Sequence, residues 1–227
     1  MSPRQPITFH GFMSYLIDTF TPIAGPFVEH VQLTVIALVI ALAIAVPLSV
    51  LLARVRWLRG PVLGVLGVIY TIPSLSLLVL LIPLFGLGAT PAIIALVAYA
   101  QLVLVRNIVV GLTGVDPAIV EAARGMGMSG WQRFRQVELP LALPLILAGV
   151  RLATLSIIAI GTVAALVGAG GLGTPLLIGV TTGDTRKIIA GSIAVAVLAF
   201  GANTILRILE RRAALKIYGE EQQPAHN

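Results

Sequence analysis

The side chains that could do chemistry gather in one short polar stretch, residues 121–140, which reads EAARGMGMSGWQRFRQVELP. Five of its twenty residues are charged, although charged residues make up only 11% of the 227-residue chain. Carboxylate and guanidinium groups on a surface helix can form charge-assisted hydrogen bonds with another protein. Ala122 and Ala123, which follow Glu121, have no bulk to obstruct a close approach. The composition therefore favours docking in the groove of a partner protein.

Catalytic and metal-binding chemistry has no comparable candidate. The chain contains no cysteine, which excludes disulfides, zinc ribbons and thiol chemistry. It has no GxxxxGK(S/T) sequence to cradle phosphates, and no grouping of His and Glu that suggests a metal or nucleophile site. We therefore expect that the chain is not an enzyme, has no catalytic residue or metal ligand, and binds no cofactor itself.

Local helix signals surround the polar stretch. Asp116 is suited to an N-cap and Pro117 to the first helical position. Gly125 and Gly127 should end this helix, because glycine is unfavourable inside helices and accepts left-handed dihedrals. A second short helix is expected over residues 129–137, before the chain returns to apolar sequence. The prediction is a helix, a bend set sterically by Gly127, and another helix, both lying on a membrane surface.

Long apolar runs must position this polar stretch. Hydrophobic residues make up 58% of the chain, and its 11% of charged residues is far below the quarter or so that soluble domains carry. A helix needs about 20 apolar residues to cross the hydrocarbon core of a bilayer. Five runs qualify: residues 31–53, 61–85, 90–111, 141–167 and 188–209. The sequence therefore predicts an all-α integral membrane protein with about five transmembrane helices.

Basic residues lie mostly on one side of these five spans. Three follow the first span, four lie at or after the third, and four close the fifth; only three lie on the other side, and Arg151 falls within the fourth span. Because Lys and Arg are enriched on the cytoplasmic side, we expect an external N-terminus, a cytoplasmic C-terminus and a large cytoplasmic loop at residues 112–140. The net charge of +6 then reflects topology and contact with membrane lipid, not nucleic-acid binding.

The polar stretch resembles the EAA motif of permeases from binding-protein-dependent ABC importers. The motif residues Glu121, Ala122, Ala123, Gly127, Leu139 and Pro140 match in identity and spacing. Val137 replaces the usual isoleucine, which removes one methylene. The resemblance covers about residues 28–212 and implies the type I ABC importer (MetI-like) fold, with a cytoplasmic coupling helix between the third and fourth spans.

Three further stretches resemble the permeases for glycine betaine, choline, carnitine and related osmoprotectants. They are TIPSLSLLVLLIPLFGLG at 71–88, PAIIALVAYAQLVLVRNIVVGL at 91–112 and VGAGGLGTPLLIGV at 167–180. Methionine permeases share a similar glycine-rich turn but usually differ in the span before it. The resemblance thus implies an osmoprotectant importer, with an amino acid such as methionine as the alternative substrate.

The same resemblance implies partners and a location. Two permease subunits, identical or related, form the pore in a bacterial cell membrane, and an extracytoplasmic solute-binding protein delivers the substrate. Each permease presents its EAA loop to a cytoplasmic dimer of ATPase subunits, which uses the ATP and Mg²⁺. Nucleotide-driven closure of the ATPases would then move the loop and switch the pore from inward-facing to outward-facing.

Two further groups of residues are candidates for the solute pathway. Pro73 should kink the second span, where hydroxyl groups can satisfy freed backbone groups; the expected path residues are Tyr70, Thr71, Pro73, Ser74 and Tyr99. Two tyrosines do not by themselves form the aromatic cage that quaternary ammonium recognition usually requires. The glycine-rich turn is interpreted as an outer gate or, alternatively, as a flexible connector; its residues are Gly168, Gly170, Gly171 and Gly173.

The ends of the chain and Arg151 complete the predictions. Residues 1–27 are expected to form an interfacial segment, with residues 7–20 as an amphipathic helix or a disordered tail. Residues 213–227 are expected to be a polar tail, disordered beyond Lys216. Arg151 is expected at the membrane interface or at a subunit contact, because an intramembrane charge is costly.

Two rival functions fit the sequence less well. A stand-alone secondary transporter or channel would need intramembrane acidic residues and internal repeats. Only Glu210 lies at the end of a span, and no repeat is evident. A membrane anchor that recruits a cytoplasmic protein would keep the docking loop, but it would need neither a proline-broken span nor a glycine-rich outer turn.

Overall fold

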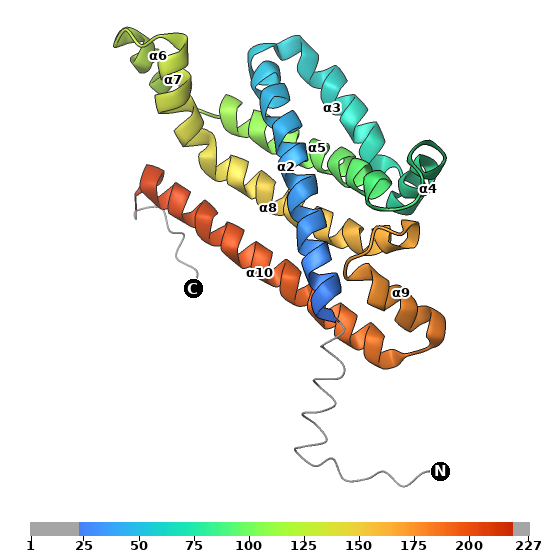
Figure 1. The fold of residues 1–227 in the computed structure, drawn as a ribbon. Coiled ribbons are helices and arrows are strands. Elements are labelled where there is room, and N and C mark those ends of the chain that lie inside the picture. The colour runs from blue at the N-terminus through green and yellow to red at the C-terminus, as the bar shows by residue number, and fades with distance from the viewer. Residues whose placement is uncertain (1–22, 220–227) are drawn as a thin grey trace, which may run out of the picture.

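The computed structural model describes residues 23–219, which form helices joined by short turns, with no strand among these residues (Figure 1). The helices in chain order are α2 (Ala24–Arg54), α3 (Arg56–Thr71), α4 (Ser74–Phe85), α5 (Ala89–Thr113), α6 (Pro117–Gly125), α7 (Gly130–Arg133), the π-helical turn η2 (Phe134–Glu138), α8 (Leu139–Val163), the 3₁₀ turn η3 (Ala164–Val167), α9 (Gly173–Thr182) and α10 (Thr185–Tyr218). The predicted all-α class is confirmed.

The prediction of about five spans is confirmed as four helical segments long and apolar enough to cross a membrane, with a bent helix pair at the predicted second span. Helices α3 and α4 pass the same test only together and meet at an angle of 93°, as in a broken span or a re-entrant loop. The break falls at Ile72 and Pro73, between the two helices. Proline has no N–H for the helix ladder and drives the preceding residue out of the helical region. Ile72 accordingly has extended dihedrals, φ −64° and ψ 129°.

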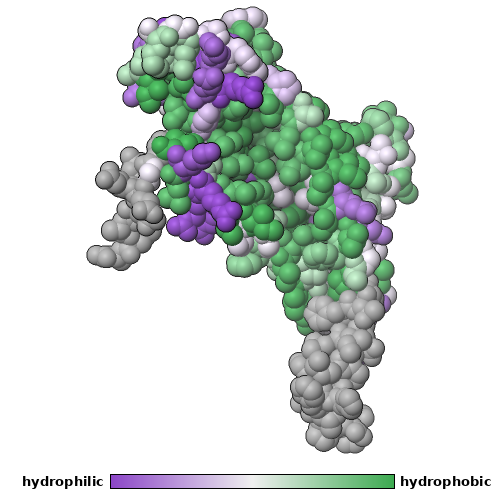
Figure 2. All heavy atoms as spheres, turned by 60° about the vertical axis from the view of Figure 1, so that its left-hand side comes forward, coloured by the Kyte–Doolittle hydropathy of each residue, from purple (hydrophilic) through white to green (hydrophobic). Residues whose placement is uncertain are grey.

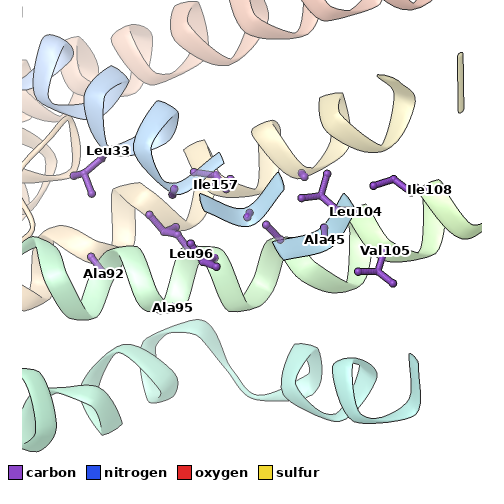
Figure 3. Packing of buried hydrophobic residues seen from close by; sticks show 14 of the residues in the cluster. Leu33, Ala45, Ala92, Ala95, Leu96, Leu104, Val105, Ile108 and Ile157 are labelled. Carbon is purple, nitrogen blue, oxygen red and sulfur yellow. The ribbon is translucent and has the colours of Figure 1, made fainter. Parts of the chain in front are cut away.

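The core lies where α5 packs between α2 and α8, while α10 covers the opposite side of α8. The side chains that fill this core include Leu33 and Ala45 of α2, Leu96 and Leu104 of α5, and Ile157 of α8 (Figure 3). Many buried positions on α2 and α5 are alanine, which lets the helix backbones approach closely, as is common where membrane helices pack together.

The surface is largely apolar, as a lipid environment requires. Figure 2 shows hydrophobic residues over most of the visible face and hydrophilic residues mainly around α6–α7 and the C-terminal end of α10. The exposed apolar side chains include Val39, Val65, Val197 and Phe200, on three different helices. In water such a surface would drive aggregation, whereas lipid or partner helices can cover it.

Several element boundaries differ from the sequence-based expectation. The second helix of the polar stretch is not a separate surface helix, because helix runs continuously from Gly130 to Val167 through the π-helical turn. The helix α9 directly after the glycine-rich turn was not expected. Helix α10 continues to Tyr218, past the expected domain end at 212, because alanine, leucine and basic residues favour helix and Gly219 (φ 72°) ends it.

Only the last residues of the predicted N-terminal segment 1–27 fall within the described part of the chain. Helix α2 begins at Ala24, four residues before the expected start of the membrane domain. The expected interfacial helix at 7–20 and the last eight residues of the chain lie outside the described residues.

Candidate functional site

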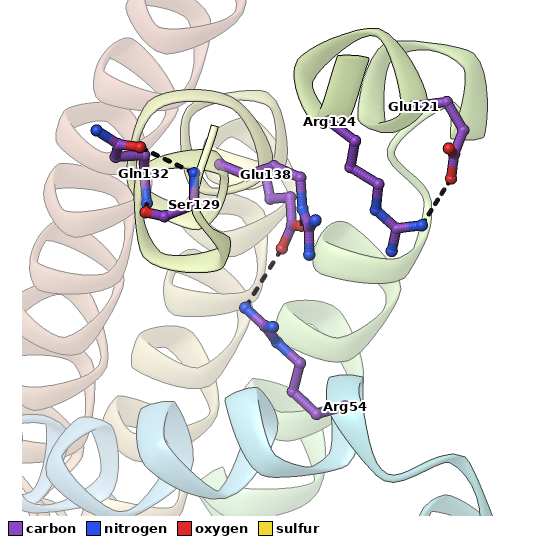
Figure 4. Close-up of polar contacts among 7 residues, drawn as sticks. Arg54, Glu121, Arg124, Ser129, Gln132 and Glu138 are labelled. Carbon is purple, nitrogen blue, oxygen red and sulfur yellow. Dashed lines mark hydrogen bonds and ion pairs between the residues drawn. The ribbon is translucent and has the colours of Figure 1, made fainter. Parts of the chain in front are cut away.

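The EAA loop is defined here as residues 116–140. Its first helix and its bend are as predicted, and its second helix continues into α8. The Asp116 carboxylate accepts a hydrogen bond from the Ala118 N–H at 2.8 Å, and Pro117 occupies the first turn. Gly127 has φ +75°, the left-handed conformation that lets the chain bend there. Ser129 then caps α7, since its backbone N–H donates to Gln132 Oε1 at 2.8 Å and its hydroxyl accepts from the Gln132 N–H (Figure 4).

The exposed surface of the loop differs from the expected one. Glu121 and Ala122 are exposed, and Glu121 forms an exposed ion pair with Arg124 at 2.8 Å (Figure 4). Ala123 is buried, so the expectation that it faces a partner is wrong; its small side chain lets α6 pack on the rest of the chain. Two large apolar side chains that were not predicted are exposed instead: Met126 at 71% and Trp131 at 67%.

A charged network fixes the base of the loop. Glu138 accepts a hydrogen bond from Arg133 Nε at 2.7 Å, and its other oxygen lies 3.8 Å from Arg54 Nη2 at the end of α2 (Figure 4). The Arg54 guanidinium also lies 5.7 Å from the centre of the Phe134 ring, which stacks on Trp131. Arg133, one of the basic residues of the predicted cytoplasmic loop, is a largely buried partner of Glu138. The network connects α2 to the loop.

Leu139 and Pro140, the last two motif residues, lie at the start of α8 rather than on the exposed surface. Both are only partly exposed. Pro140 has no N–H to donate, and the helix widens to a π-helical turn immediately before it. A cavity of about 280 Å³ lies between the end of α2, α6 and η2, and neither Leu139 nor Pro140 lines it.

The five expected path residues lie together at the break of the second span. Tyr70, Thr71, Pro73, Ser74 and Tyr99 all line one cavity of about 400 Å³, which Ser156, Ala159 and Ile160 of α8 complete. The Tyr99 hydroxyl donates to the Ile72 carbonyl, so a residue of α5 satisfies a backbone group freed by the break. Thr71 contributes as expected, since its hydroxyl donates to the Val68 carbonyl at 2.7 Å.

The glycine turn, residues 168–173, is tightly held by the rest of the chain. Gly168, Gly170 and Gly171 have φ between +73° and +79°, and a β-carbon at Gly173 would lie 2.0 Å from the Thr162 carbonyl oxygen. The Gly88 N–H donates to the Val167 carbonyl at 2.7 Å, directly before the turn. The glycine turn is therefore closely packed against the rest of the chain.

Two residues at the start of α2 hold the glycine turn. The Gly171 N–H donates to the Glu29 carboxylate at 3.0 Å, and the Leu172 N–H donates to His30 Nδ1 at 3.2 Å. Since Nδ1 accepts, Nε2 carries the proton and donates to the Ile158 carbonyl of α8 at 3.1 Å. His30 is buried with both ring nitrogens paired. Sequence reasoning missed this pair; its only local signal was two polar residues just before a long apolar run.

Comparison with known proteins decides the family. Residues 45–215 match the family described as the binding-protein-dependent transport system inner membrane component. The chain belongs to this family. The protein is therefore a permease of an importer system, located in the membrane, and the expected resemblance is confirmed.

Curated relatives extend along most of this permease. It is 40% identical over 188 residues to the glycine betaine/carnitine/choline transport system permease protein OpuCB of Bacillus subtilis, covering 83% of this chain and 87% of the relative. It is 41% identical over 201 residues to the osmoprotectant import permease protein OsmW of Salmonella typhimurium, covering 86% and 94%. A solved inward-facing structure of the MetNI methionine ABC transporter has a TM-score of 0.75 at 23% identity, covering 85% of this chain and 98% of that one. That likeness confirms the MetI-like fold.

Arg151 of the permease forms an ion pair within the chain. Its Nε lies 2.9 Å from Glu210 Oε2 on α10, and its Nη1 donates to Asn203 Oδ1 at 3.3 Å. The pairing neutralises a charge on the fourth span, which offsets the cost of placing arginine there.

Among residues 23–219, no three His, Asp or Glu side chains come together as a metal site would require.

Proposed function

We propose that this permease is the transmembrane subunit of an ATP-driven importer for an osmoprotectant such as glycine betaine, choline or carnitine. The observation that carries the proposal is about 40% identity, over more than four-fifths of the chain, to permeases named for these solutes. The uncharged cavity at the broken span supports it, because small methylated zwitterions and cations need no opposite full charge to pass. The likeness to the methionine transporter is one of fold, so methionine remains the less favoured substrate.

In this proposal the EAA loop couples the permease to a cytoplasmic ATPase dimer, which holds the ATP and Mg²⁺. Glu121, Ala122, Met126 and Trp131 form the docking surface, because they are the exposed polar, small and large apolar side chains of the loop. Exposed aromatic and methionine side chains are typical anchors in protein interfaces. Movement of the docked loop would reach α2 through Glu138, and α8 through the continuous helix.

The proposed orientation has the N-terminus outside and the C-terminus in the cytoplasm. Supporting this, the EAA loop, the junction of α2 and α3 (Arg54–Arg59) and the basic end of α10 carry most of the positive charge. The glycine turn lies at the other end of the molecule (Figure 1). It would then form part of the outer gate, facing the solute-binding protein, and a second permease subunit, identical or related, would complete the pore.

The test is ATP hydrolysis by the reconstituted complex, titrated with binding protein loaded with glycine betaine or with methionine. Betaine-loaded binding protein should stimulate the wild type. Glu121→Ala should reduce stimulation, whereas Arg124→Ala, which breaks the same ion pair but keeps the carboxylate, should retain it. Stimulation by methionine-loaded protein alone would refute the osmoprotectant assignment. Equal stimulation of wild type and Glu121→Ala would refute the docking role of Glu121.

A further inference from the structure

The cavity at the break of the second span is a wide-open depression with the volume of a small-ligand site. Its volume of about 400 Å³ lies within the usual range for such sites. It is lined by α3, α4, α5 and α8, so residues far apart in sequence converge on it. None of the lining residues is acidic or basic. A ligand therefore finds aromatic rings, hydroxyl groups and apolar side chains, but no full opposite charge.

Two aromatic rings give the cavity its chemical character. The Tyr70 and Tyr99 rings pack edge to face, with centres 5.9 Å apart and planes at 70°. Tyr99 is 4% exposed and its hydroxyl is held by the Ile72 carbonyl, so its ring has a fixed position. Tyr70 is 42% exposed, and its ring is the one that a ligand can reach. Tyrosine faces attract cations within about 6 Å of the ring centre.

Backbone charge favours a cation at the same place. Tyr70 and Thr71 lie in the last turn of α3, at the negative end of the helix dipole, although the Val68, Ile69 and Ile72 carbonyls there already accept hydrogen bonds. The Thr71 and Ser156 hydroxyls donate to carbonyls of their own helices, so each oxygen keeps lone pairs that can accept. Ala159 and Ile160 add apolar contacts that suit methyl groups.

We propose that this cavity is a binding site for the quaternary ammonium group of the solute during its passage, with the Tyr70 ring as the cation–π surface. Tyr99 is a positioning residue, because it fixes both the Tyr70 ring and the Ile72 carbonyl. The proposal rests on the function proposed above and deepens it: the permease selects for methylated ammonium groups after the binding protein has released the solute.

The absence of cysteine from the chain makes a direct test possible. Ser156→Cys introduces one thiol into the cavity, and its rate of reaction with a small thiol reagent reports occupancy. Glycine betaine, added to the permease–ATPase complex without binding protein, should slow labelling at this position. Trp57→Cys is the matched control, since Trp57 is exposed at the opposite end of α3, and its labelling should not respond.

The aromatic contribution is tested in the Ser156→Cys background. Tyr70→Phe keeps the ring and should preserve protection, whereas Tyr70→Leu should raise the betaine concentration for half-protection by about two- to thirty-fold, the range of one cation–π contact. A second comparison requires no further substitution: choline should protect, and its uncharged isostere 3,3-dimethylbutanol should protect at much higher concentration or not at all.

The outcomes separate this proposal from the proposed function. Betaine-dependent ATPase stimulation with equal protection by choline and the isostere, or with no effect of Tyr70→Leu, would overturn the ammonium site and leave the importer intact. A Ser156→Cys thiol that never reacts would also overturn it, because a solute could not enter a site that a small reagent cannot reach. Loss of betaine-stimulated hydrolysis in the wild type would instead overturn the proposed function.

Discussion

Replacing Gly173 with alanine should destabilise the permease strongly, because the glycine turn has no room for a side chain there. The new β-carbon would lie 2.0 Å from the Thr162 carbonyl oxygen and 2.7 Å from the Ala165 β-carbon. Ordinary contacts are about 3.5 Å or longer, so the backbone of α8 or α9 must move by at least about 1 Å. Overpacking of this kind costs about 1–3 kcal/mol, and we expect the upper end because the obstructing atom belongs to the backbone.

The assay is the thermal unfolding midpoint of the purified permease in detergent. At roughly 2–4 °C per kcal/mol for a chain of this size, Gly173→Ala should lower the midpoint by about 6–12 °C. Gly201→Ala is the matched control: this helical glycine of α10 has no atom within 4 Å of the new β-carbon. It should be neutral or stabilise by up to about 1 kcal/mol. A midpoint for Gly173→Ala equal to that of wild type, or an equal loss for both variants, would refute the close packing.

Three other substitutions test separate contacts. Gly127→Ala should lower the free energy of unfolding by about 1–2 kcal/mol, because alanine is strained at the left-handed φ of +75°, and it should weaken ATPase stimulation. Gly130→Ala is the control and should do neither, since its β-carbon also meets no atom within 4 Å and its φ is not positive. Equal behaviour of the two variants would refute the role of the bend. His30→Leu should leave a buried backbone N–H of the glycine turn unpaired and lower the free energy of unfolding by about 1–3 kcal/mol, measured by denaturant titration; an unchanged value would show that this bond contributes nothing. Arg151→Met and Glu210→Leu each remove one partner of an ion pair, so the double variant should lose at least about 0.5 kcal/mol less stability than the two single losses added together. Strictly additive losses in thermal unfolding would contradict the ion pair.

The sequence by itself determined the features that depend on neighbouring residues. Asp116 and Pro117 start α6 where expected, and the bend occurs at Gly127, because caps and left-handed glycines act within one helical turn. The positions of the five spans follow from the length of their apolar runs. Pro73 breaks the second span as expected, although Pro47 and Pro144 lie within continuous helices, so a proline in the sequence marks a possible break without deciding it.

Only the tertiary structure decided which of these features meet. The bond between His30 and Leu172 joins residues 142 apart, and the hydroxyl of Tyr99 reaches a carbonyl 27 residues away. Whether Ala123 faces a partner or the core depends on how α6 packs, not on the motif that contains it. Apolar helices carry little sequence information about which of their faces meet, because lipid and protein neighbours suit the same side chains. The close packing of the helices therefore placed the glycine turn against α2 and formed one cavity from residues of four helices.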